Sequence, residues 1–206
     1  ARGEALGITD DRLSMLTNAP QSEFHLVNNP VIWLRVMPAL KPDKEWLVSE
    51  LEKAGIHTTQ MLTPMSDWRG LSFMRAKDGW GTYESGRPSE TMAAVMAFTS
   101  GEVWSVDGYF LNACAQGNKR FLYPLEDMLC PALSNYVAFL QRLGLKPPYH
   151  WIVGVEDMKG RGIQLPSQIT PRGPCLAEVV TERGEFLDGD TPEKALSPFF
   201  ANLYDA

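Results

Sequence analysis

A chain of 206 residues with 44% hydrophobic and 21% charged side chains is long enough to bury a sizeable core and has the composition of a soluble globular protein. Its net charge of -6 repels polyphosphate, so we do not expect this part of a protein to bind nucleic acid directly. No apolar run approaches the length of a membrane span, and the first residues form no hydrophobic signal segment, which predicts a cytoplasmic location and no membrane partner.

The beginning of the chain predicts an approach segment followed by strands. Residues 1–23 are interpreted as a linker from an upstream domain, and the absence of an initial methionine indicates a piece cut from a longer protein. Residues 24–27 and 31–37 are strand-like apolar runs, separated by a turn signal over residues 28–30. We therefore expect a single domain over residues 24–206.

Two segments have the pattern of amphipathic helices. The first is expected over residues 43–54, with Asp43 as its N-cap and Gly55 as its end. The second has apolar side chains at steps of three and four over residues 125–143. Gly144 follows it and two prolines come soon after, so this longer helix is expected to end there.

The stretch over residues 93–111 predicts a hairpin of two apolar strands. Ser100 and Gly101 form the expected turn, because glycine adopts the positive φ that tight hairpin turns need. A loop of two residues would place Phe98 opposite Val103. Because both faces of such a hairpin are largely apolar, we expect it in the middle of a sheet.

The remaining segments predict further strands and a helical tail. Strands are expected over residues 71–75, 79–84, 149–155 and 176–181. Residues 182–184 are expected to close the last strand. Thr191 before Pro192 and Ser197 before Pro198 each combine an N-cap residue with a proline, which predicts two short helical turns rather than one helix.

Together these elements predict an α+β fold. The sheet is expected to be mainly antiparallel and centred on the hairpin over residues 93–111. The two main helices, over residues 43–54 and 125–143, are expected to cover at least one of its faces.

One constellation could carry enzymatic chemistry. Asp157 and Lys159 form a D-x-K motif directly after an apolar strand, and Asp107 ends the second strand of the hairpin. Metal-dependent nucleases use such acids to hold Mg²⁺ and such a lysine to orient the attacking water. Against this, short motifs arise by chance and the chain is acidic. The alternative interpretation is a solvated polar turn, in which Lys159 and Arg161 are weak candidates for binding an anion.

No metal or cofactor is expected from the sequence. The histidines His25, His57 and His150 lack metal-ligand spacing. The three cysteines are widely separated and predict reduced thiols. No phosphate-binding glycine loop stands between a strand and a helix, and no serine has a hydrolase motif around it.

Three stretches taken together resemble a known family. They are VIWLRVMPAL over residues 31–40, GEVWSVDGYFL over residues 101–111, and the segment from Leu133 to Ile163. Their order and spacing resemble the region after the N-terminal domain in bacterial DNA-binding proteins of the AlbA/Schlafen-like type, often called ATP-binding or helix-turn-helix proteins. The resemblance implies a place in a multidomain protein. It implies no catalytic residue, because the stretches do not include the domain that gives the family its name.

The leading functional hypothesis is a non-catalytic accessory domain for assembly, partner contact or sensing. Its expected partners are other domains of the parent protein, and a homo-oligomer is left open. The second hypothesis is a nuclease that uses Asp107, Asp157 and Lys159. The third is a small-molecule sensor with a pocket between the helices and the sheet. We do not expect an enzyme.

Overall fold

The computed structural model describes residues 31–57, 60–66, 71–85, 91–110, 120–121, 125–163 and 174–206. The strands are β1 (Ile32–Pro38), β2 (Ser72–Arg75), β3 (Gly79–Ser85), β4 (Thr91–Phe98), β5 (Val103–Asp107), β6 (Arg120–Phe121), β7 (Tyr149–Val155), β8 (Gly162–Ile163) and β9 (Val180–Phe186). The helices are α2 (Val48–Gly55), α4 (Glu126–Arg142) and α5 (Pro192–Asp205). The predicted approach segment over residues 1–23 and the strand over residues 24–27 lie outside the described residues.

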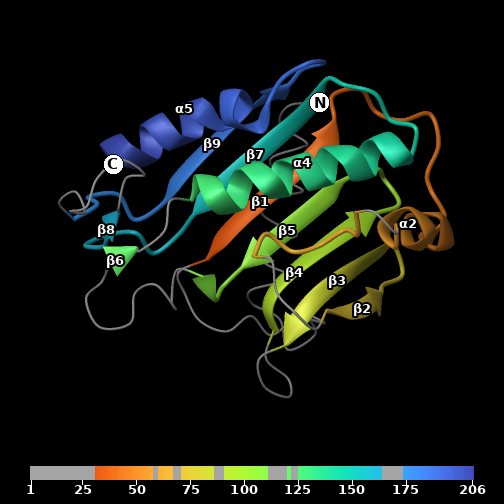
Figure 1. The fold of residues 1–206 in the computed structure, drawn as a ribbon, viewed down its shortest axis with the longest axis horizontal. Helices are drawn as coiled ribbons and strands as arrows, with labels where there is room; N and C mark the ends of the chain where they lie inside the picture. The colour runs from red at the N-terminus through yellow and green to blue at the C-terminus, as the bar shows by residue number, and fades with distance from the viewer. Residues whose placement is uncertain are drawn as a thin grey trace.

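The main sheet has seven strands in the order β2-β3-β4-β5-β1-β7-β9, and every neighbouring pair is antiparallel. β6 and β8 form a separate short parallel pair. The described helices α2, α4 and α5 pack against one face of the main sheet (Figure 1). The predicted α+β fold, with an antiparallel sheet centred on the hairpin β4–β5 and covered by helices, is confirmed. The helix α5 is a third cover that the prediction did not include.

Side chains alternate between the two faces of the sheet, as the pleat requires. On β1, Ile32, Leu34 and Val36 belong to the core under the helices, whereas Trp33 and Met37 belong to a second apolar cluster on the other face. The second cluster comprises Val31, Trp33, Met37, Ala94, Met96, Phe98, Trp104, Val106 and Ile152, all buried. The central strands are therefore buried on both faces, as their continuous apolar sequences indicate.

The register of the central hairpin differs from the prediction by one residue. Ala97, not Phe98, is opposite Val103, and Phe98 instead bonds to Glu102 around a loop of three residues. Gly101 ends this loop with φ +79°. Loops of this length place a left-handed residue at their end, so Gly101 lengthens the turn that the sequence pattern assigned to two residues.

The first helix begins later than predicted. Asp43 lies before α2 rather than at its N-terminus, and the helix begins after Leu47, whose N–H donates to the Glu50 carboxylate at 2.7 Å. Trp46 stays outside the helix because its N–H donates to Thr99 O at 3.0 Å and its indole is buried. A tertiary contact with the hairpin loop thus overrides the local helical preference of this segment.

The long helix α4 agrees with its predicted bounds to within one residue at each end. Its apolar stripe is buried against the sheet, with Leu129, Leu133, Tyr136 and Leu140 fully inaccessible to solvent. Gly144 has φ +83° and donates to Gln141 O. This left-handed residue ends the helix, as glycine at this position commonly does.

The strand predicted over residues 176–181 lies further along the chain. β9 covers Val180–Phe186 and pairs with β7 throughout, so residues 182–184 lie inside the strand instead of closing it. β9 is at the edge of the sheet and has exposed charged side chains, which hid its alternating pattern. Gly184 is needed inside the strand because a Cβ there would lie 2.4 Å from the Trp151 indole.

Three glycines make room for tryptophans in this way. The indole of Trp33 lies over Gly154, that of Trp151 over Gly184, and that of Trp80 over Gly55. A Cβ at any of these glycines would lie between 2.1 and 2.4 Å from a ring carbon, which is far inside van der Waals contact. Each tryptophan thereby buries one ring face against bare backbone.

The tail is one helix rather than two helical turns. Thr191 caps α5, as predicted, by accepting the Lys194 N–H at 3.3 Å. Pro198 lies inside the helix and has no N–H to donate to Lys194 O. The Ser197 hydroxyl donates to that carbonyl at 2.9 Å instead. The Ser197–Pro198 pair therefore continues the helix that its sequence signature was expected to start.

Ser197→Ala is expected to lower the free energy of unfolding by about 1 kcal/mol, because the Lys194 carbonyl loses its donor. Ser49→Ala is the matched control, since Ser49 is an exposed helical serine on α2 and its replacement is expected to change stability by less than about 0.5 kcal/mol. Chemical denaturation of both variants measures the difference. Equal stabilities would show that Pro198 is tolerated without this hydrogen bond.

Among the described helices, none is long and apolar enough to cross a membrane.

Candidate functional site

The topology brings the two predicted acids to the same end of the sheet. β5 and β7 both pair with β1, and Ile32 is opposite Asp107 on one side and Val155 on the other. The Cα atoms of Asp107 and Val155 are therefore two strand spacings apart, or about 10 Å. Asp157 follows beyond Val155. The acids are neighbours across β1, but each belongs to a different local network.

Asp107 is held by hydrogen bonds under the helices. Its side chain is buried, and its Oδ1 accepts the N–H groups of Tyr109 at 2.9 Å and Phe110 at 2.7 Å. Its Oδ2 accepts the hydroxyl of Ser66. Burial raises the pKa of Asp107, and the three hydrogen bonds oppose that rise. This carboxyl group therefore caps the turn after β5 and fastens the segment that contains Ser66.

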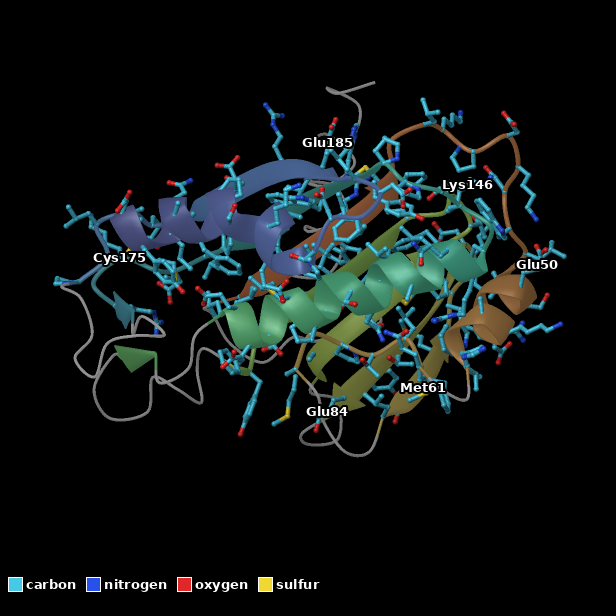
Figure 2. All side chains as sticks on the ribbon, turned by 45° about the horizontal axis from the view of Figure 1, so that its top comes forward. Glu50, Met61, Glu84, Lys146, Cys175 and Glu185 are labelled. Carbon is cyan, nitrogen blue, oxygen red and sulfur yellow. The ribbon has the colours of Figure 1, made fainter. Side chains whose placement is uncertain are left out.

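Glu84 is the second acid of this cluster, and no motif in the sequence marks it. Ala93 is opposite both Glu84 and Asp107, so the two carboxyl groups lie on the same face with only a methyl group between them. Figure 2 shows Glu84 at the end of β3, on the side of the sheet that α4 covers. Among the described residues, none donates a hydrogen bond to its buried Oε2. Burial first, and then the charge of Asp107, raise the pKa of Glu84 to about 7.

The segment over residues 60–66 joins this cluster to α4 and the sheet. The Asn135 amide on α4 donates to Met61 O at 2.9 Å, and the Thr82 hydroxyl on β3 donates to Leu62 O at 2.9 Å. These bonds place Ser66 beside Asp107. No local sequence signal marks this convergence, because it depends on three segments that are distant along the chain.

Tyr136 of α4 lies next to Ser105 of β5. Its ring is fully buried, and burial raises the pKa of its hydroxyl, while the nearby Ser105 hydroxyl opposes that rise. Ser105 donates to Ala94 O at 2.8 Å and is itself inaccessible to solvent. The cluster of Ser66, Glu84, Ser105, Asp107 and Tyr136, called here the acid cluster, is thus an internal polar group rather than an open cleft of the described surface.

Asp157 and Lys159 lie in a turn after β7. The φ of Asp157 is +54°, and Arg161 fixes this conformation by donating to Asp157 O and to Asp157 Oδ2, both at 2.7 Å. Lys159 is exposed at the tip of the turn, and Met158 between them is fully buried. The D-x-K motif is therefore a folded turn in which the Asp157 carboxylate is paired with Arg161. Of the two weak anion-binding candidates, Lys159 is exposed and Arg161 is bonded to Asp157.

Other residues considered for chemistry lie apart from the acid cluster. His150 pairs across strands with Glu185 at 3.3 Å. Cys130 and Cys175 are buried free thiols, and burial raises the pKa of Cys130 to about 12. His25 and Cys114 lie outside the described residues. Within the part of the chain that the structure describes, no three His, Cys, Asp or Glu side chains are grouped so that they could hold a metal ion.

Comparison of the chain with protein-family models, with curated proteins and with solved structures found no match.

Proposed function

We propose that this chain is a non-catalytic accessory domain, used for assembly or partner contact, in a larger cytoplasmic bacterial protein that resembles the AlbA/Schlafen-like DNA-binding proteins. The observation that supports the proposal is that both candidate catalytic acids are hydrogen-bonded within the chain itself, Asp107 mainly by the backbone and Asp157 by the side chain of Arg161. Asp107 accepts hydrogen bonds from two backbone N–H groups and from one hydroxyl. Asp157 accepts a hydrogen bond from the side chain of Arg161.

A metal-binding carboxylate needs free lone pairs and access for the ion. Asp107 is only 1% exposed, and its acceptor positions face the chain itself. Asp157 is more exposed, but the guanidinium of Arg161 lies 2.7 Å from its Oδ2 and repels a divalent cation at the same oxygen. These contacts favour a structural role for the two acids over a catalytic one.

Asp157→Ala is expected to leave cleavage of nucleic acid at the background level and to lower the free energy of unfolding by about 1 kcal/mol, because a partly exposed ion pair is lost. The measurement incubates the chain with Mg²⁺ or Mn²⁺ and with plasmid DNA, single-stranded DNA or RNA. Lys159→Ala is tested beside Lys146→Ala, a matched change at another exposed loop lysine. Cleavage that disappears in Asp157→Ala and Lys159→Ala, but persists in Lys146→Ala, would overturn the proposal in favour of the nuclease.

A further inference from the structure

The strand β9 is the last strand of the seven-stranded sheet that the described residues form. It runs for seven residues without a proline or a bulge, whereas β2 at the opposite edge has only four residues. Among the described residues, none forms a strand with the outer side of β9. An edge of this length is a template for another strand. Figure 2 shows Glu185 on the rim of the molecule, pointing away from α5.

The hydrogen bonds of β7 decide which groups of β9 face outward. Pro148 O accepts from Ala39, and Glu156 N donates to Val31, so the even-numbered positions of β7 bond toward β1. In an antiparallel sheet the odd-numbered positions then bond toward β9, where their partners are the even-numbered residues 180–186.

The backbone groups of Thr181, Arg183 and Glu185 therefore face outward. The Arg183 N–H agrees with this assignment, because its acceptor is the side chain of Glu182 at 3.0 Å rather than a carbonyl of β7. All three side chains are exposed. A strand added at this edge would bond to these residues.

Charge selects one arrangement for two copies of β9. An antiparallel pair with Gly184 on the two-fold axis places Arg183 of each copy opposite Glu185 of the other, with their outward backbone groups in register. The neighbouring registers that keep this backbone pattern place Arg183 opposite Arg183 or Glu185 opposite Glu185. Like charges directly opposite are destabilising, so only the register centred on Gly184 is complementary.

The residues around the axis fit this register. Gly184 has no side chain where the two backbones come closest, at a pair without hydrogen bonds. Leu187, an apolar residue that is 47% exposed directly after β9, falls opposite Thr181 of the other copy. Glu185 keeps its contact with His150 on its own chain, since that pair lies on the β7 side of the carboxylate.

We infer that the partner of this edge is a second copy of the chain, joined by antiparallel pairing of β9 with β9 about Gly184. The inference rests on the assembly role proposed above and names its partner. A single-strand contact buries little area, so we expect a dissociation constant on the order of 10 μM.

The test is sedimentation of the full 206-residue chain up to about 100 μM, a range that detects weak interfaces. The wild-type chain is expected to dimerise. Arg183→Glu places four acids at the axis and is expected to weaken dimerisation at least tenfold, as is Glu185→Arg with four bases. The double variant Arg183→Glu/Glu185→Arg restores opposite charges and is expected to restore the dimer to within a few-fold. Arg75→Glu on the edge strand β2 is the matched control and is expected to leave it unchanged.

A wild-type chain that stays monomeric over this range would overturn the inference, and so would a dimer that is indifferent to Arg183→Glu. Failure of the double variant to recover dimerisation would overturn the register. Circular dichroism of each variant confirms that it is folded. Neither result depends on the cleavage assay, so the dimer can fail while the accessory function stands, and a metal-dependent cleavage activity would overturn the accessory function whatever the oligomeric state.

Discussion

Arg35→Met is expected to lower the free energy of unfolding by about 3 to 5 kcal/mol, because it leaves the Glu102 carboxylate buried without its partner. Arg35 is 2% exposed and lies on the face of the sheet opposite the helices. Its Nε is 2.7 Å from Glu102 Oε1, and its NH2 group donates to Oε2 at 2.8 Å. One charge-assisted hydrogen bond and one close ionic contact hold both side chains in one geometry. Urea denaturation of the purified variant measures the loss.

Two further variants separate this loss from a general effect of removing an arginine. Arg75→Met removes an exposed pair with Glu52 at 3.4 Å and is expected to cost less than about 1 kcal/mol. The double variant Arg35→Met/Glu102→Leu removes both buried charges and is expected to recover most of the stability. A double variant as unstable as Arg35→Met alone would contradict the argument, because the loss would then come from packing rather than from a stranded charge.

Glu84→Gln is expected to remove a pH dependence of stability between about pH 4.5 and pH 7. The pKa of Glu84 in the folded chain is raised from 4.5 to about 7, so the folded state binds this proton more tightly than the unfolded state does. Stability is therefore fully present below the unfolded pKa and falls as the pH rises to the folded pKa. The loss for the wild-type chain is expected to be roughly 3 kcal/mol across this window.

The measurement compares urea denaturation of wild type and Glu84→Gln at a series of pH values. The difference between the two chains isolates Glu84, because all other acidic residues are the same in both. Glu50→Gln is the matched control, since the Leu47 N–H lowers the pKa of the exposed Glu50. The stability that the Glu50 carboxylate contributes is lost as the pH falls. Glu50→Gln is therefore expected to change the pH dependence of the free energy of unfolding in the opposite sense to Glu84→Gln. A parallel profile for wild type and Glu84→Gln would show that the carboxyl group ionises freely.

The parts of the fold that could be predicted from the sequence are those with a strong local period. The apolar steps of α4 and the continuous run of β7 identify a buried helix and a buried strand. The central hairpin was recognised for the same reason. The register of this hairpin could not be predicted, because the register depends on whether Gly101 ends a loop of two residues or of three. β9 was misplaced because an edge strand has little apolar pattern to follow.

The contacts of the candidate site are even harder to predict from local sequence patterns. The sequence predicts Asp107 as a possible metal ligand, but its partner Ser66 comes from the segment over residues 60–66, which also bonds to β3. Glu84 meets Asp107 only because Ala93 is opposite both. Such convergence is set by strand order and register, which no local pattern encodes. The residue types at the end of β5 were visible in the sequence, and the structural use of the carboxylate was not.

The tryptophans that lie over glycines restrict how this chain can diverge. A methyl group at Gly154 and the indole of Trp33 compete for one volume, and the same is true of Gly184 and Trp151. Replacing only one member of a pair leaves a steric clash or a void. Replacing the tryptophan by a smaller ring and the glycine by a larger residue at the same time fills the space again. Substitutions at these positions are therefore expected to be tolerated only when both members of a pair change together.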